Sequence, residues 1–277
     1  MRDNAANMPS VIIRYGFNKK IKTDCLDKNK SIPFFMAGTL LLSLISLVYL
    51  DIDWVKILGR VPDIGAVFYR LIQFDFKFMD LIAQAMWETI CITVLSTIYS
   101  VVLGLFFGMF AAENVFGVRW FAILVQSWFT FLRAVPTPVW VLLMMVCLGM
   151  GPAAGIAGLC VHTTAFFTRA FAQSFESIPA ETIEALQATG VGRIGVFFNA
   201  VLPAALSQLV AWIAMRFEIN FSECAILGMI GAGGIGFIIS RSIQGYEYGT
   251  AGVAILLVFA FAYTIERVFI FIKNKLR

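Results

Sequence analysis

The stretch that decides the fold is residues 177–203, which reads SIPAETIEALQATGVGRIGVFFNAVLP. Pro179 suits the first turn of a helix, where the N–H that it lacks has no partner in any case. Glu184 follows near that start, where the helix dipole favours negative charge, and Gly190 suits a helix end. A second helix is then expected to run up to Pro203. We predict a short helix–turn–helix outside the bilayer, of a shape that docks into a groove of another protein.

The composition around this stretch is that of a polytopic membrane protein. Of the 277 residues, 60% are hydrophobic, 14% are charged and 27 are Phe, whereas soluble domains contain about 25% charged residues. A soluble chain could not bury so much apolar surface, so a cytosolic globular enzyme and a disordered chain are both excluded.

Apolar runs of about 20 residues, the length that crosses a bilayer, predict six membrane-spanning helices. These runs cover residues 32–50, 82–112, 120–148, 153–175, 202–227 and 249–272. The third contains Arg133, Pro136 and Pro138, so a kink is expected there. Residues 51–80 are expected to form an extramembrane loop with short amphipathic pieces, and residues 228–248 a glycine-rich, broken segment.

The basic residues predict the orientation. Residues 1–30 hold seven Lys or Arg against three Asp, which indicates a cytoplasmic tail rather than a signal peptide or a nucleic-acid-binding stripe. With both termini and the loops at 113–119 and 176–203 inside, thirteen Lys or Arg are cytoplasmic and five are external. We therefore expect a tail at 1–30 and a transmembrane domain at 31–277, in the inner membrane of a bacterium with both termini cytoplasmic.

The polar chemistry is sparse. None of the five cysteines is spaced as a pair, and there is one histidine, His162, so neither a disulfide nor a metal site is expected. A hydrogen-bonded packing role is expected for His162, with a proton relay as the alternative. An intramembrane hydrolase is excluded, because the chain has one His and no paired nucleophile–base motif or metal cluster.

The spacing of Glu184-Ala185, Gly190 and Leu202-Pro203 resembles the signature cytoplasmic loop of bacterial ABC importer permeases. Two positions depart from that pattern, Leu186 and Ala200. The resemblance implies an all-α permease of the type I importer fold with six membrane helices, in which residues 176–203 form a coupling helix. In that family this helix sits in a cleft of a separate ATPase, with Glu184 and Gly190 at the joint.

Two further stretches extend the resemblance over most of residues 80–272. Arg133-Ala-Val-Pro136 resembles a sequence of methionine and phosphonate permeases, and Arg216-Phe-Glu-Ile-Asn220 with Gly228–Gly236 resembles the phosphonate and phosphite branch. Ser222 and Glu223 stand where that branch often has a basic residue. The resemblance implies transport of phosphonate, phosphite or hypophosphite, with methionine or another polar solute as the alternative.

Charges within the spans are expected to face protein or water. They are Glu88, Arg133, Arg169, Arg216, Glu218 and Glu223. One interpretation is structural and pairs Arg133 with Glu88 or Glu218. The other places Arg133, Arg216, Glu218 and Asn220 along the path of an oxyanion, since a guanidinium matches phosphonate oxygens two at a time. Arg169 is explained by snorkelling to the cytoplasmic surface.

The glycine cluster of Gly231, Gly233, Gly234 and Gly236 contains a G-x-G-x-x-G pattern. No βαβ unit surrounds it, so nucleotide binding is not expected there. We expect a re-entrant element near the external gate, or else glycines that let helices pack closely. Close helix packing is also expected at Gly104 with Gly108 and at Gly151 with Gly155.

The chain has no P-loop sequence, so we expect no cofactor in the chain itself. By the resemblance, a cytoplasmic ABC ATPase dimer binds ATP and Mg²⁺, and a periplasmic or lipid-anchored binding protein delivers the ligand. A second copy or a sister permease completes the pore within membrane lipid, and transport proceeds by alternating access. A proton-coupled secondary transporter is less favoured, because repeated halves and intramembrane acid relays are not evident.

Overall fold

The structure is a computed structural model that describes residues 31–50 and 52–275 of the chain. The predicted tail at residues 1–30 lies outside the described residues, as does Cys25. The chain divides into two compact units, residues 1–62 and residues 63–277. Every regular element in the described residues is a helix, as the sequence predicts.

The first unit contains the helices α2 (Ser31–Tyr49) and α3 (Trp54–Gly59). Residues Ile32–Tyr49 have a mean hydropathy of 2.0 and expose their side chains, as expected of a helix whose surroundings are lipid. The carboxylate of Asp53 accepts the N–H of Lys56 at 3.0 Å and caps α3. The helix α4 (Val61–Ile72) begins at the boundary of the units, so residues 51–80 do contain short helical pieces.

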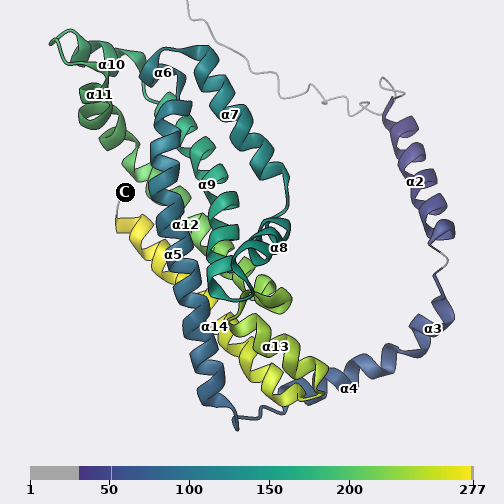
Figure 1. The fold of residues 1–277 in the computed structure, drawn as a ribbon. Helices are drawn as coiled ribbons and strands as arrows, with labels where there is room; N and C mark the ends of the chain where they lie inside the picture. Colours follow the sequence, from purple (N-terminus) through teal and green to yellow (C-terminus); the bar gives the residue numbers. More distant parts are fainter. Residues whose placement is uncertain (1–30, 51, 276–277) are drawn as a thin grey trace, which may run out of the picture. The chain divides into compact units, whose positions relative to one another are not determined.

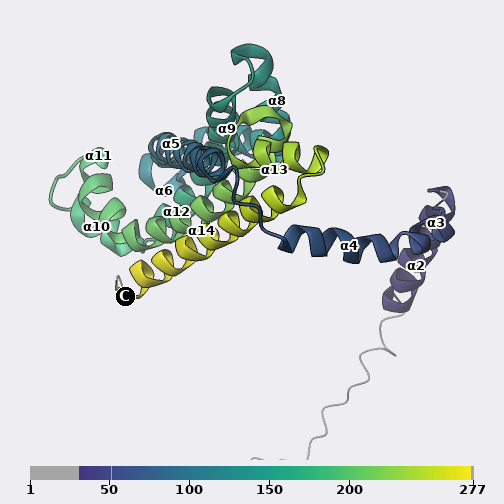
Figure 2. The same ribbon diagram turned by 90° about the horizontal axis from the view of Figure 1, so that it is seen from below.

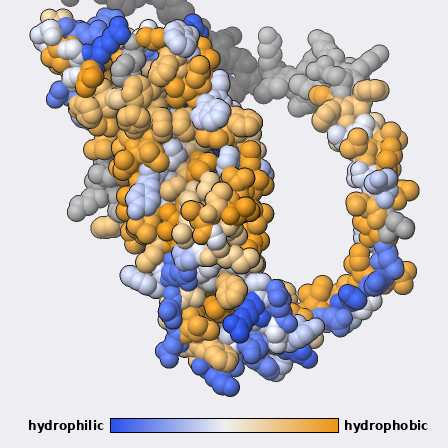
Figure 3. Space-filling view, in the orientation of Figure 1, coloured by the Kyte–Doolittle hydropathy of each residue, from blue (hydrophilic) through white to orange (hydrophobic). Residues whose placement is uncertain are grey.

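The second unit is a helical bundle with α9 at its centre, packed against α5, α7, α8 and α12 (Figures 1 and 2). Its main helices are α5 (Met79–Ala111), α7 (Arg119–Ala134), α8 (Thr137–Leu148), α9 (Pro152–Glu176), α12 (Leu202–Leu227) and α14 (Tyr248–Lys275). Shorter elements join them: α6 (Glu113–Phe116), α10 (Ala180–Gln187), α11 (Arg193–Val196), the π-helical η1 (Phe197–Val201) and η2 (Gly228–Ala232), and α13 (Ile235–Gln244). Figure 3 shows apolar side chains around the middle of this unit and hydrophilic ones at both of its ends.

Among the described residues, four helices are long and apolar enough to cross a membrane, and a fifth span results if α7 and α8 count as one. The predicted run at 153–175 corresponds to α9, which is not among them. This helix is less apolar because its surroundings are protein rather than lipid. It buries Thr163, Thr164, Thr168 and Ser174 against neighbouring helices.

The predicted kink in the third run is confirmed. The helices α7 and α8 meet at an angle of 87° across Val135 and Pro136. Pro136 has no N–H to donate to the carbonyl of Leu132, four residues earlier. The indole Nε1 of Trp140 donates to that carbonyl instead, at 3.0 Å, so the bend leaves this backbone acceptor satisfied.

The predicted close packing is confirmed at Gly104, Gly108 and Gly155, and it is wrong at Gly151. A Cβ on Gly104 would lie 2.5 Å from Cβ of Phe167, and one on Gly108 would lie 3.1 Å from Cβ of Phe171, so α5 and α9 approach closely there. Gly155 similarly faces Ala232 at 3.1 Å. Gly151 has no neighbour within 4 Å of such a Cβ and instead precedes the first turn of α9.

Candidate functional site

The hairpin at residues 180–196 forms the first part of the candidate site. The helix α10 follows Pro179 and ends at Gln187, and the N–H of Gly190 donates to the carbonyl of Gln187 at 2.9 Å. Gly190 has a φ of +82°, which glycine adopts without steric cost. Glu184 and Ala185 are exposed on α10. The hairpin therefore presents the two residues that the sequence selected on an open surface.

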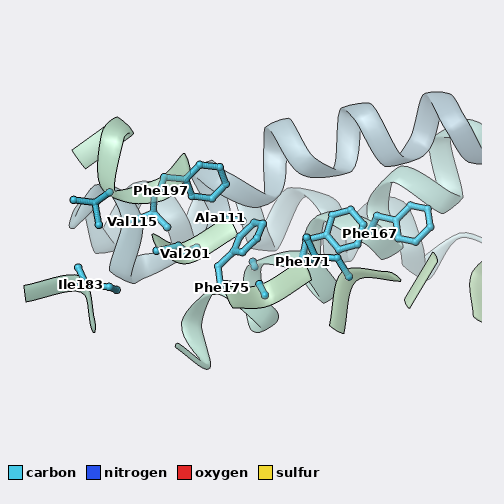
Figure 4. Packing of buried hydrophobic residues seen from close by; sticks show 13 residues of the cluster. Ala111, Val115, Phe167, Phe171, Phe175, Ile183, Phe197 and Val201 are labelled. Atoms are coloured by element: carbon cyan, nitrogen blue, oxygen red, sulfur yellow. The ribbon is translucent and has the colours of Figure 1, made fainter. Parts of the chain in front are cut away.

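A buried apolar cluster fixes this hairpin to the bundle (Figure 4). Ile183 of α10 belongs to the same cluster as Phe175 at the end of α9 and Phe197 of η1. The rings of Phe175 and Phe197 meet edge to face at 5.1 Å. A displacement of α10 would thus be passed directly to α9 and α12, because packed side chains transmit movement.

Polar bonds fasten the same end of α9. The amide Nδ2 of Asn114 in α6 donates to the carbonyl of Phe175 at 2.8 Å. The backbone N–H of Glu113 donates to Oε1 of Glu176 at 3.0 Å. The α6 turn, the end of α9 and the hairpin are therefore held together by both apolar and polar contacts.

Leu202 and Pro203 do not separate two helices, so this part of the prediction was wrong. The helical turns instead run without a break from Arg193 through η1 into α12, which ends at Leu227. Pro203 lies in the first turn of α12, directly after the π-helical turn of η1, where the N–H of Leu202 donates to the carbonyl of Phe197. A wider turn gives room for the proline ring, which clashes in a regular helix.

The second part of the candidate site is a buried polar cluster around Arg216 of α12. Arg216 is 4% exposed, and its Nη2 atom lies 3.0 Å from Nδ1 of His162, 3.4 Å from Oγ1 of Thr163 and 3.2 Å from Oε2 of Glu223. Because a guanidinium can only donate, Nδ1 of His162 accepts this bond. His162 is therefore hydrogen-bonded as predicted.

Asn220 lies one turn beyond Arg216 and is fully buried. Its Nδ2 donates to Oγ1 of Thr97 at 3.0 Å, and its Oδ1 accepts from Oγ1 of Thr163 at 2.9 Å. One amide thereby joins α5, α9 and α12. This arrangement is that of a structural clamp, since both ends of the amide are occupied by protein.

Arg133 is exposed near the end of α7, and its guanidinium lies over the ring of Phe166, 5.8 Å from the centroid. Arg216 lies on the same ring at 5.5 Å. The structure thus brings these two predicted arginines together through one aromatic side chain. Glu218 is exposed and is not part of this group.

The predicted pairing of Arg133 with Glu88 or Glu218 is wrong. Among the described residues, the ion pairs are Arg119 with Glu113 and Arg216 with Glu223. Glu88 instead accepts the backbone N–H of Gly234 through Oε2 at 3.2 Å. Its carboxylate is therefore used to hold the glycine-rich segment.

This segment is broken as predicted, and all four selected glycines lie in or beside the break. Gly231, Gly233 and Gly234 have positive φ values. Gly234 lies against Thr89 of α5, whose Oγ1 accepts the N–H of Ile235 at 2.8 Å. Gly236 packs directly on the carbonyl of Ala225, where a Cβ would clash. The glycines here serve both a turn and a close approach.

Sequence reasoning missed the polar residues of α5. Thr89, Thr93 and Thr97 are all buried. Each forms a hydrogen bond outside α5: Thr89 and Thr93 with Ile235 and Cys224, and Thr97 with Asn220. Their spacing of four places them on one face of a helix, which could have revealed them. The described residues contain no group of three or more metal-binding side chains, and Cys91, Cys147, Cys160 and Cys224 are free.

The comparison with protein families decides the family of this chain. Residues 104–272, which include both parts of the candidate site, match the family described as "Binding-protein-dependent transport system inner membrane component". The chain belongs to this family. The fold expected of an ABC importer permease is accordingly present in this inner membrane component.

Individual relatives agree with that assignment. The chain is 30% identical to the phosphate-import permease protein PhnE of Mycolicibacterium smegmatis over 92% of its own length and 50% of that protein, so it spans half the length of that curated relative. It is 27% identical to the phosphite transport system permease protein PtxC of Stutzerimonas stutzeri over 76% of each chain.

A solved structure has the same fold. The inward-facing MetNI methionine ABC transporter matches with a TM-score of 0.67 and 24% identity, over 74% of this chain and all of that chain. At this identity the likeness concerns the fold alone.

Proposed function

We propose that this inner membrane component is the permease subunit of an ABC importer that moves a small phosphorus oxyanion into the cell. The substrate class is phosphonate, phosphite or hypophosphite. The observation that carries the proposal is that Arg133 and Arg216 both lie over the ring of Phe166, at 5.8 and 5.5 Å from its centroid, in a chain whose relatives include a phosphite permease protein. Guanidinium groups match phosphorus oxyanions in both charge and geometry.

In this proposal, six spans cross the bacterial inner membrane with both termini cytoplasmic. The hairpin within residues 176–203 is the coupling helix, with Glu184, Ala185 and Gly190 at the joint with a cytoplasmic ABC ATPase dimer. Leu202 and Pro203 continue it into α12. The packing of Ile183 beside Phe175 and Phe197 supports this role, because it ties the exposed surface of α10 to two membrane helices.

ATP and Mg²⁺ would be bound by the ATPase partner, and this chain would change no covalent bond. A binding protein would deliver the ligand at the opposite end of the bundle, near the gate glycines Gly231, Gly233, Gly234 and Gly236. A second permease copy or a sister permease would complete the pore. The spans would then rock between outward-open and inward-open states as the ATPases close.

Along the substrate path we assign direct contact with the anion to Arg133, which is exposed, and a supporting role to Arg216 and Asn220, which are buried. Glu218 is exposed on α12 and would face the pore or a second subunit, because an isolated carboxylate is costly in lipid.

The test is uptake into proteoliposomes that contain the reconstituted transporter and its binding protein, with radiolabelled phosphite as substrate and methionine as the competing candidate. Arg133→Ala should abolish phosphite uptake while the complex still assembles. Glu184→Lys should stop uptake without stopping insertion into the membrane. If the wild type carries methionine and no phosphorus oxyanion, the substrate class is wrong. If Glu184→Lys transports normally, the coupling assignment is wrong.

A further inference from the structure

An open surface hollow, with about 500 Å³ of accessible space, lies against α7 and α9 on the side of Arg133 that faces the hairpin, and the proposed function does not use it. Its polar lining consists of Gln126, Ser127 and Thr130 of α7 and Arg169 of α9, and the remaining lining is apolar. The hollow therefore combines one full positive charge with three uncharged polar side chains.

Arg169 is held over this hollow by a defined hydrogen bond. Its Nη1 donates to Oγ1 of Thr130 at 3.0 Å, and the same hydroxyl donates to the backbone carbonyl of Gln126 at 2.6 Å. In the described part of the chain, no carboxylate lies within ion-pair distance of Arg169. Its charge is thus oriented but not neutralised by the protein.

Snorkelling does not account for this geometry. Arg169 is seven residues from the end of α9, or about 10 Å along the axis. A snorkelling side chain would extend along α9 toward that end, whereas the hydrogen bond crosses to α7. The Cα–Cβ bond of a helical residue also tilts toward the helix N-terminus, which here is the opposite direction. The positive charge of Arg169, placed in this way, requires water or an anion to stabilise it.

The position of Arg169 continues the series of arginines already described. On the antiparallel pair α7 and α9, Arg133 meets Phe166, and one turn nearer the hairpin Thr130 meets Arg169. Arg216, which is buried, and Arg133, which is exposed, therefore share the ring of Phe166, and Arg169 lies one turn nearer the hairpin. An anion leaving Arg133 in that direction would next meet the hollow.

We propose that this hollow is a second binding site for a small tetrahedral phosphorus oxyanion on the cytoplasmic side of Arg133. The inference rests on the proposed function. The N–H groups of Arg169 that Thr130 does not use would bind two oxygens of the anion, and the hydroxyl of Ser127 would donate to a third. The amide Nε2 of Gln126 donates to the carbonyl of Ala111 at 2.8 Å and to Oε1 of Glu176 at 3.5 Å, so its own Oε1 remains to accept the proton of a singly protonated anion.

A phospholipid head group carries the same phosphorus oxyanion, so the experiment separates the two sources. The full chain is purified with its ATPase partner and placed in nanodiscs of galactolipid, which contain no phosphorus. Binding of radiolabelled phosphite is measured by equilibrium dialysis, with and without added phosphatidylglycerol, for the wild type, Arg169→Gln and Ser127→Ala. Arg119→Gln is the matched control, because Arg119 lies on α7, which also lines the hollow, while its own side chain is 80% exposed and does not line it.

The wild type and Arg119→Gln should show two classes of phosphite site in the galactolipid discs. Arg169→Gln should weaken one class by roughly ten- to a hundred-fold, the effect of losing charge-assisted hydrogen bonds, and Ser127→Ala should weaken the same class less. The proposal is overturned if Arg169→Gln binds phosphite like the wild type. It is also overturned if phosphatidylglycerol abolishes the Arg169-dependent class, which would assign the hollow to lipid. If the wild type binds and transports no phosphorus oxyanion, the proposed function itself has failed.

Discussion

Arg216 and Glu223 form an ion pair within α12, with Nη2 3.2 Å from Oε2. Their spacing of seven residues is about two helical turns, so both side chains leave the helix on the same face. The guanidinium is almost fully buried, whereas the carboxylate side chain is 23% exposed. A single helix thus neutralises its own buried charge without a partner from another helix.

Breaking this pair should destabilise the chain. Glu223→Gln leaves a buried guanidinium without its counter-ion, which should lower the free energy of unfolding by about 2–4 kcal/mol. The measurement is denaturation of the detergent-solubilised protein. Arg216→Met with Glu223→Gln should recover part of the loss, because the double variant buries no uncompensated charge.

The exposed pair of Arg119 and Glu113, at 3.5 Å, provides the matched control. Its removal should change stability by less than about 1 kcal/mol. If the effects of Arg216→Met and Glu223→Gln simply add in the double variant, the two charges are not energetically coupled and the interpretation is wrong.

The tight turn after α12 predicts a strong effect at Gly236. A Cβ at this position would clash with the backbone carbonyl of Ala225, and backbone atoms cannot move aside as a flexible side chain can. Gly236→Ala should therefore cost at least about 3 kcal/mol of stability or prevent folding. Gly192→Ala is the control, since no atom lies within 4 Å of its Cβ position. Equal thermal stabilities of the two variants would contradict the close approach.

Substitutions at Asn220 and at Thr164 should have opposite effects on the stability of the protein. Asn220→Ala removes two buried hydrogen bonds and leaves Thr97 and Thr163 without that partner, so it should cost about 2–4 kcal/mol. Oγ1 of Thr164 is buried without a hydrogen-bond partner, so Thr164→Val should be neutral or slightly stabilising. Thermal unfolding of both variants tests this contrast. An Asn220→Ala protein that is as stable as the wild type but fails to bind phosphite would mean that Asn220 contacts substrate instead.

Sequence patterns predicted the positions of the long helices, though not a confirmed number of membrane spans, because hydrophobic runs and proline act locally. The run at 82–112 became α5, and Pro136 placed the bend between α7 and α8. The pattern around Pro203 misled for a related reason. A proline normally interrupts a helix, but the π-helical turn of η1 accommodates Pro203. No sequence pattern predicted this π-helical turn.

The candidate site could be predicted only in part because pairing depends on three-dimensional packing. Glu184 and Gly190 were selected because their spacing resembles that of the family's cytoplasmic loop, and the structure places them on one hairpin. The partners of Arg216 come from residues 54 and 53 positions away, His162 and Thr163, as well as from its own helix. The distance along the chain between α9 and α12 does not determine which of their side chains meet. The charge partner Glu223 lies seven residues on, so helix geometry could have favoured it over Glu218, which is two residues on and leaves the helix in nearly the opposite direction.

The hairpin predicts two separable kinds of uncoupling. Ile183 is 9% exposed and packs in the cluster that includes Phe175 and Phe197. Ile183→Ala should loosen α10 by about 2–4 kcal/mol of lost packing, so limited proteolysis should cut near Gly190 faster than in the wild type. Glu184→Ala alters the exposed surface alone, so its proteolysis should be unchanged.

Both variants should reduce substrate uptake per ATP hydrolysed in the reconstituted transporter. In Ile183→Ala the hairpin no longer moves with α9 and α12. In Glu184→Ala the contact of the hairpin with the ATPase is weakened. Ala188→Ser is the control, an exposed position at the end of α10. If Ile183→Ala increases proteolysis while uptake per ATP stays normal, movement is not passed through the apolar cluster, and the route must lie through the polar bonds between Asn114, Glu176 and the end of α9.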